Sequence, residues 1–70
     1  MNLSEEIQII EALLFASPEP LTQTRINLIF ETDAPKLDET VKELNRHYEK
    51  ANRSFKIQGI AGGFQLTTLP

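Results

Sequence analysis

The side chains that could carry acid–base or metal chemistry are few in this chain. Its 70 residues include one histidine and no cysteine, so the sequence predicts no structural zinc site and no disulfide. His47 and Tyr48 are neighbours on a predicted helix, where consecutive side chains diverge. Glu43 precedes His47 by one helical turn and can pair with it on the helix surface. We therefore expect no catalytic dyad and no metal around the histidine.

The acidic pairs and the glycine pair have simple structural interpretations. Glu5-Glu6 and Asp38-Glu39 stand where helices are predicted to begin, and carboxylates there stabilise the positive end of the helix dipole. Gly62-Gly63 lacks the lysine and the Ser or Thr of a phosphate-binding loop, so it is interpreted as a turn. The sequence thus indicates a protein that is not an enzyme and holds no cofactor and no metal.

A row of cations favours DNA binding as an alternative function. Four basic residues follow one another at helical spacing: Lys42, Arg46, Lys50 and Arg53. Three acids can each pair with one of them: Asp38, Glu43 and Glu49. The same helix opens with acids that would face the phosphates of a duplex. A DNA-binding transcription regulator is therefore the alternative, but we expect direct DNA binding to be weak or absent.

The first predicted helix has more apolar residues than one core-facing stripe needs. Ile7, Ile10 and Leu14 share one face, to which Phe15 adds, while Ile9, Leu13 and Ala16 fall on another. In the second helix, Leu28 points away from a core-facing set: Ile26, Ile29 and Phe30. Contiguous exposed apolar area usually marks an interface. We predict a protein interface at four residues: Ile9, Leu13, Ala16 and Leu28. The alternative is that the other elements cover the first helix from several sides.

Three helices are predicted to position these side chains. The first spans about residues 5–16, with Asn2 or Ser4 as its N-cap, and ends before a Ser-Pro step. The second spans about residues 23–30 behind the N-cap Thr22.

The third helix has the clearest period in the chain. Asp33 is its expected N-cap, with Pro35 in the first turn. Its apolar residues recur at helical spacing: Leu37, Val41, Leu44 and Tyr48. We expect this helix to end near Ala51.

The apolar pattern then changes from helical to alternating, which predicts two strands. Phe55 and Ile57 alternate with polar residues, and so do Phe64, Leu66 and Thr68. Gly62-Gly63 supplies the positive φ angles that a tight hairpin turn needs. Three helices followed by a β-hairpin wing form a winged helix, an α+β fold, and we expect residues 1–70 to form one such domain. The hairpin tip has no cation to enter a minor groove.

Size and composition point to a small domain that associates with a partner. A core of this size contributes only about 3–5 kcal/mol to folding. The net charge is −3, and the first residues carry acids instead of the basic region of a secretory signal. The longest apolar stretch is too short to cross a bilayer. We expect a cytoplasmic protein without a membrane partner.

Two segments resemble bacterial segregation and condensation protein B. The first is IIEALLFASPEPLT, residues 9–22, whose Ser-Pro-Glu-Pro-Leu-Thr connection is not a general feature of helix-turn-helix proteins. The second is IAGGFQLTT, residues 60–68, which is similar to the family's glycine-pair wing. The pattern of the third helix fits the same family, although residues 23–27 are less acidic than usual for it.

The resemblance implies a function in chromosome condensation and segregation. It implies two tandem winged-helix domains, of which residues 1–70 are the N-terminal one, and a homodimer formed mainly through that domain. It also implies binding to the kleisin subunit, segregation and condensation protein A, and through it to the SMC protein at the nucleoid. The family has no catalytic residues.

Overall fold

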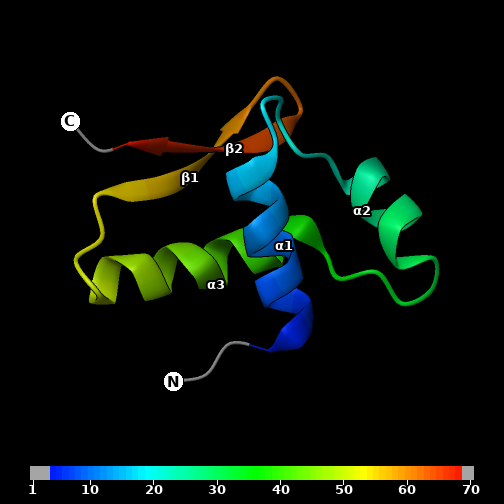
Figure 1. Ribbon diagram of the computed structural model, residues 1–70, viewed down its shortest axis with the longest axis horizontal. Helices are drawn as coiled ribbons and strands as arrows, with labels where there is room; N and C mark the ends of the chain where they lie inside the picture. The colour runs from blue at the N-terminus through cyan, green and yellow to red at the C-terminus, as the bar shows by residue number, and fades with distance from the viewer. Residues whose placement is uncertain (1–3, 69–70) are drawn as a thin grey trace.

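The computed structural model describes residues 4–68, which form three helices followed by a two-stranded antiparallel sheet (Figure 1). The elements are α1 (Glu5–Ala16), α2 (Gln23–Phe30), α3 (Leu37–Lys50), β1 (Phe55–Ile60) and β2 (Gly63–Thr68). In Figure 1, α1 crosses in front of α3, α2 lies to the right, and the hairpin lies above α3. This order confirms the predicted α+β winged helix.

The first helix begins and ends at the predicted signals. Ser4 is the N-cap, and its hydroxyl accepts a hydrogen bond from the backbone N–H of Ile7 at 3.2 Å. The alternative cap, Asn2, lies outside the described residues. Ile10 and Leu14 are buried on the inner side of α1. Ser17 then takes an extended conformation before Pro18, as expected for the residue that precedes a proline.

The start of α3 differs from the prediction. The helix begins at Leu37, so Pro35 precedes it, and Asp33 has a positive φ of 52° instead of capping the helix. The backbone N–H of Leu37, at the first residue of α3, donates to Oε1 of Gln23 at 2.6 Å. Nε2 of Gln23 donates to the carbonyl of Pro35 at 3.0 Å. A side chain from the start of α2 therefore serves as the cap of α3.

The core contains one side of each helix and the inner face of the hairpin. Its buried hydrophobic residues are Ile10, Leu14, Leu21, Ile26, Leu37, Val41, Leu44, Tyr48 and Ile57. All four apolar positions predicted for the third helix are among them, which confirms its core-facing side. Burial of each large side chain is worth roughly 1.5–3 kcal/mol.

The hairpin turn uses one of the two predicted glycines. Ile60 pairs with Gly63, so Ala61 and Gly62 form a two-residue turn, with φ angles of 48° and 79°. Positive φ at both residues is the feature of a type I′ turn. Gly63 was expected in the turn but lies in β2. A Cβ on Gly63 would stand 2.8 Å from the carbonyl oxygen of Leu21, so its glycine is needed for close approach.

Leu21 forms an additional, one-residue strand beside β2. Its N–H donates to the carbonyl of Phe64 at 2.7 Å, and the N–H of Phe64 donates back to the carbonyl of Leu21 at 2.8 Å. On the other edge of the sheet, Asn45 of α3 occupies the place of a strand. Its Nδ2 donates to the carbonyl of Ile57 at 2.9 Å, and its Oδ1 accepts from the N–H of Ile57 at 2.8 Å. The hairpin is thus attached on one edge to the connection between α1 and α2 and on the other edge to α3.

Candidate protein-interaction surface

Five large hydrophobic side chains are exposed within the described part of the chain: Ile9, Phe15, Leu28, Ile29 and Ile60. They lie on α1, on α2 and at the tip of the hairpin. One exposed apolar side chain is ordinary on a monomer. The arrangement of these side chains on each element therefore decides which of them form a surface.

The outer face of α1 is apolar over two helical turns. Ile9 is 41% exposed, and Ala12 and Ala16 are exposed on the same side of the helix. Leu13, at the border of this face, is partly buried and packs against the core. The structure therefore brings Ile9 and Ala16 together on one outer face, with Leu13 as a bridge to the core.

The outer side of α2 has the most exposed of these side chains. Leu28 is 73% exposed, as expected for a residue that points away from the core. Ile29, which was expected to face the core, is 44% exposed, so that prediction is wrong. This short helix contacts the core through the buried Ile26 and the partly buried Phe30. Leu28 lies on a separate helix from Ile9 and Ala16 (Figure 1).

Phe15 is a surface residue that the sequence did not identify. It was assigned to the core side of α1, but its side chain is 54% exposed. Its ring contacts Phe55 edge-on, with ring centroids 5.5 Å apart, and Phe55 in turn contacts Tyr48 at 4.9 Å. Ala12, one turn before Phe15 on the same side, is exposed. That small neighbour was the available signal that this side faces outward.

A partly buried hydrogen bond joins α1 to α3. The hydroxyl of Tyr48 donates to a carboxylate oxygen of Glu11 at 2.6 Å. Burial, together with the nearby Glu11 carboxylate, raises the pKa of Tyr48 above its ordinary value. The hydroxyl therefore stays protonated at neutral pH and keeps donating. This contact holds Ile9 and Ala16 on the outer side of the domain.

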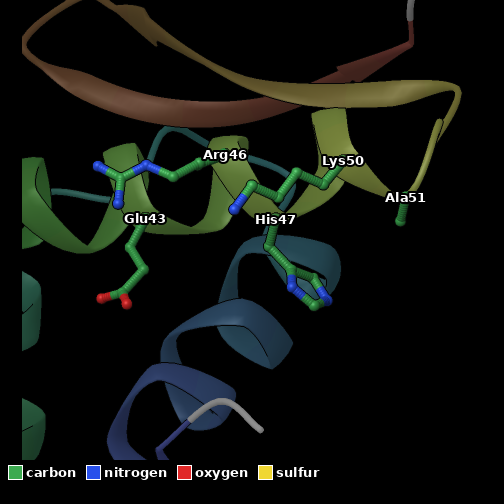
Figure 2. Close-up of a pocket in the computed structure, with 5 residues that line it drawn as sticks. All are labelled: Glu43, Arg46, His47, Lys50 and Ala51. Atoms are coloured by element: carbon green, nitrogen blue, oxygen red, sulfur yellow. The ribbon is translucent and has the colours of Figure 1, made fainter. Parts of the chain in front are cut away.

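The outer side of α3 has a shallow depression of about 230 Å³. Its lining residues are Glu43, Arg46, His47, Lys50 and Ala51 (Figure 2). In Figure 2, Glu43 and His47 point to one side of the helix, whereas Arg46 and Lys50 lie across it. All five residues belong to α3 or to its C-cap. The depression is therefore an open space between side chains of one helix.

The cations of α3 are exposed, but acids lie among them. Lys42, Arg46, Lys50 and Arg53 all face solvent. Within residues 4–68, one ion pair is closer than 4.0 Å: Lys36 and Glu39, at 3.8 Å. The three pairs of these cations with Asp38, Glu43 and Glu49 that the sequence allows are therefore not formed at this distance. Three carboxylates nevertheless share the outer side of the helix: Glu39, Glu43 and Glu49. The surface of α3 is one of mixed charge.

Residues 4–68 contain no group of three or more His, Asp or Glu side chains that could hold a metal ion. None of the described helices is long and apolar enough to cross a membrane.

Comparison with known proteins identifies a family over most of the chain. The family model described as segregation and condensation complex subunit ScpB matches residues 8–70. Segregation and condensation protein B of Symbiobacterium thermophilum is 44% identical over 62 residues, which cover 89% of this chain and 28% of the relative. The protein of the same name from Syntrophotalea carbinolica is 37% identical over 70 residues, which cover 100% of this chain and 36% of the relative.

A solved structure has the same fold. The crystal structure of a conserved hypothetical protein from Chlorobium tepidum is similar with a TM-score of 0.85 and 38% sequence identity. The match covers 94% of this chain and 42% of that chain. The present chain therefore spans less than half the length of each of these relatives.

Proposed function

Since the chain belongs to the segregation and condensation complex subunit ScpB family, we propose that it is a non-catalytic subunit of the bacterial SMC–kleisin complex. Two copies form a homodimer, which binds the kleisin subunit, segregation and condensation protein A, and through it the SMC protein. The complex acts in the cytoplasm, at the nucleoid, in chromosome condensation and segregation. Residues 1–70 supply the N-terminal winged-helix domain of a two-domain protein.

The observation that carries the proposal is the apolar outer surface of α1 and α2. Ile10 and Ile26 already fill the core sides of these helices, yet Ile9 and Leu28 remain exposed on their outer sides. Burial of one large apolar side chain is worth roughly 1.5–3 kcal/mol. In a two-fold dimer each contact is made twice, so a few such residues can offset the cost of association. We assign Ile9, Leu13, Ala16 and Leu28 to the interface with a protein partner.

A direct contact with DNA is weak or absent in this proposal. Non-specific affinity for a DNA duplex comes from cations that neutralise its phosphates. On α3 and just after it, this would fall to Lys42, Arg46, Lys50 and Arg53. Acids on the outer side of α3 oppose it, and Asp38 and Glu39 occupy the first turn of the helix. The chemistry of α3 therefore supports protein contact over the alternative of a DNA-binding regulator.

Light scattering after size-exclusion chromatography tests the homodimer. We expect the mass of a dimer for the wild-type chain and a dimer dissociation constant about tenfold or more higher for Ile9→Glu, because a buried carboxylate lacks a partner there. Ile60→Glu is the matched control, since Ile60 is exposed to a similar degree but lies at the hairpin tip. A wild-type chain that stays monomeric at high concentration would contradict the homodimer.

Titration calorimetry with purified segregation and condensation protein A tests the kleisin contact. We expect saturable binding by the wild-type chain, weakened about tenfold or more in Leu28→Glu if α2 contributes as assigned. The hairpin-tip variant Ile60→Glu is expected to bind as the wild type does. If the wild-type chain gives no heat of binding and does not co-elute with segregation and condensation protein A, this domain does not bind the kleisin.

A further inference from the structure

The outer side of α2 combines two exposed apolar side chains with one cation. Leu28 is 73% exposed and Ile29 is 44% exposed. Arg25, which is also exposed, precedes them by three and four residues, so the three side chains share one side of the helix. We call Arg25, Leu28 and Ile29 the α2 outer face. It belongs to the helix at the right-hand end of the domain in Figure 1.

Contacts on the inner side of α2 set which of its residues face solvent. Ile26 is fully buried, and the partly buried Phe30 packs against the core. The side-chain amide of Gln23 bonds to the N–H of Leu37 and to the carbonyl of Pro35. The α2 outer face is therefore formed before a partner arrives, which lowers the entropic cost of binding.

Arg25 stands at the end of α2 where a cation is least favourable. It is the third residue of the helix, and the N-terminal turn is the positive end of the helix dipole. Both other helices have a pair of acids in this turn. The N-cap Thr22 accepts a hydrogen bond from the N–H of Arg25 at 3.2 Å, so a glutamate at position 25 would complete a capping box. Helix stability therefore favours an acid at this position and gives no reason for the arginine.

Arg25 also has no charged partner within the described residues. Its guanidinium forms no ion pair closer than 4.0 Å among residues 4–68, and no acid stands one helical turn before or after it. The surrounding sequence is acidic, because residues 1–35 contain six acids and, in Arg25, one base. Two of these acids, Glu31 and Asp33, follow α2 directly and are exposed. A phosphate backbone would meet these acids, whereas a single carboxylate placed between apolar groups fits the α2 outer face in charge and in polarity.

We propose that the α2 outer face binds an amphipathic segment of the kleisin subunit, in which one carboxylate lies beside large apolar side chains. The carboxylate pairs with the guanidinium of Arg25, and the apolar side chains cover Leu28 and Ile29. The inference rests on the proposed kleisin contact and states the chemistry of the segment that is recognised. Ile9 and Ala16 on α1 remain for the second copy, so the two partners use different helices.

Charge reversal at position 25 tests the pairing, by titration calorimetry of the full chain with purified segregation and condensation protein A. We expect Arg25→Glu to raise the dissociation constant about tenfold or more, because two carboxylates then face each other. We expect a smaller loss for Arg25→Lys, which keeps the charge but not the two parallel hydrogen bonds of a guanidinium.

Arg46→Glu is the matched control. It is the same substitution with the same change of net charge, and Arg46 is exposed on α3, outside the α2 outer face. We expect this variant to bind the kleisin as the wild type does. Arg25→Glu is expected to fold, because its glutamate completes the capping box of α2, and circular dichroism checks this.

A charge exchange identifies the bound segment. Overlapping peptides that cover segregation and condensation protein A are titrated against the chain, and we expect the binding peptide to contain Asp or Glu within one helical turn of two large apolar residues. Replacing that acid with lysine is expected to weaken binding to the wild-type chain and to restore binding to Arg25→Glu. Such restoration requires that the two residues pair directly.

The outcomes separate the α2 outer face from kleisin binding itself. Loss of kleisin affinity in Arg25→Glu, with Arg46→Glu unchanged and the dimer mass retained, supports the site. If the wild-type chain binds the kleisin and Arg25→Glu binds it equally well, the site is overturned while the proposed function stands. Dissociation of the dimer in Arg25→Glu also overturns it, because a second copy is then the occupant. A wild-type chain that does not bind the kleisin overturns both.

Discussion

Replacing Ile26 with alanine is expected to lower the free energy of unfolding by about 2–5 kcal/mol. Ile26 is fully buried and is the one buried residue within α2. Its truncation removes the fully buried contact between this helix and the core and leaves a cavity, while the partly buried Phe30 still packs against the core. Since a core of this size supplies only about 3–5 kcal/mol, we expect the variant to be largely unfolded at 25 °C. Urea denaturation followed by circular dichroism measures the change.

Ile29→Ala is the control for this prediction. It is the same substitution on the same helix, but Ile29 is 44% exposed. We expect a cost of roughly 1 kcal/mol or less, because less apolar area leaves the core. Equal losses in the two variants would show that α2 is not attached through Ile26.

Gly63→Ala is expected to destabilise the domain by about 2–4 kcal/mol through overpacking and loss of hydrogen bonds. The added Cβ would lie 2.8 Å from the carbonyl oxygen of Leu21 and 3.0 Å from Cβ of Pro20. Leu21 must then move away from β2, which breaks both of its hydrogen bonds to Phe64. We expect faster hydrogen exchange at the amides of Leu21 and Phe64 and a lower midpoint of urea denaturation.

Gly59→Ala separates this close approach from a general effect of glycine replacement. A Cβ at residue 59 has its nearest neighbour, a ring carbon of Phe64, at an ordinary 3.7 Å. Gly59 also lies within β1, where its φ is not in the left-handed region. We expect this variant to be as stable as the wild type or slightly more so, by up to about 1 kcal/mol. If Gly63→Ala were equally harmless, the bridge between Leu21 and Phe64 would not contribute to stability.

The elements with strong local signals could be predicted from the sequence. The third helix has four apolar residues in one period, and all of them are buried. Ser4 and Thr22 cap their helices because capping depends on residues only three positions apart. The change of period at Phe55 likewise depends on neighbouring residues.

The contacts that join distant residues could not be predicted in this way. Gln23 caps α3 from 14 residues away, so local rules favoured Asp33 instead. Gly63 looked like a turn residue because its close approach to Leu21 depends on tertiary packing. A strand of one residue, such as Leu21, has no period to detect.

For the surface, helical periodicity predicts on which face of a helix a residue lies, but not how far the neighbouring elements cover that face. Ile9 and Leu28 were predicted outside and are exposed, because each has an opposite face that the core requires. Phe15 and Ile29 lie near the border of a face. Whether such a residue is buried depends on how far the neighbouring element extends over it. Helical periodicity carries no information about that neighbour.

The amide of Asn45 has a consequence for the order in which the domain assembles. A hairpin alone is marginally stable in water. Here the middle of β1 completes its hydrogen bonds only on a side chain of α3. The hairpin therefore gains its full stability after α3 has formed. Because the chain is synthesised from its N-terminus, the helices emerge first and the wing docks last. Folding of this domain thus follows the direction of its synthesis.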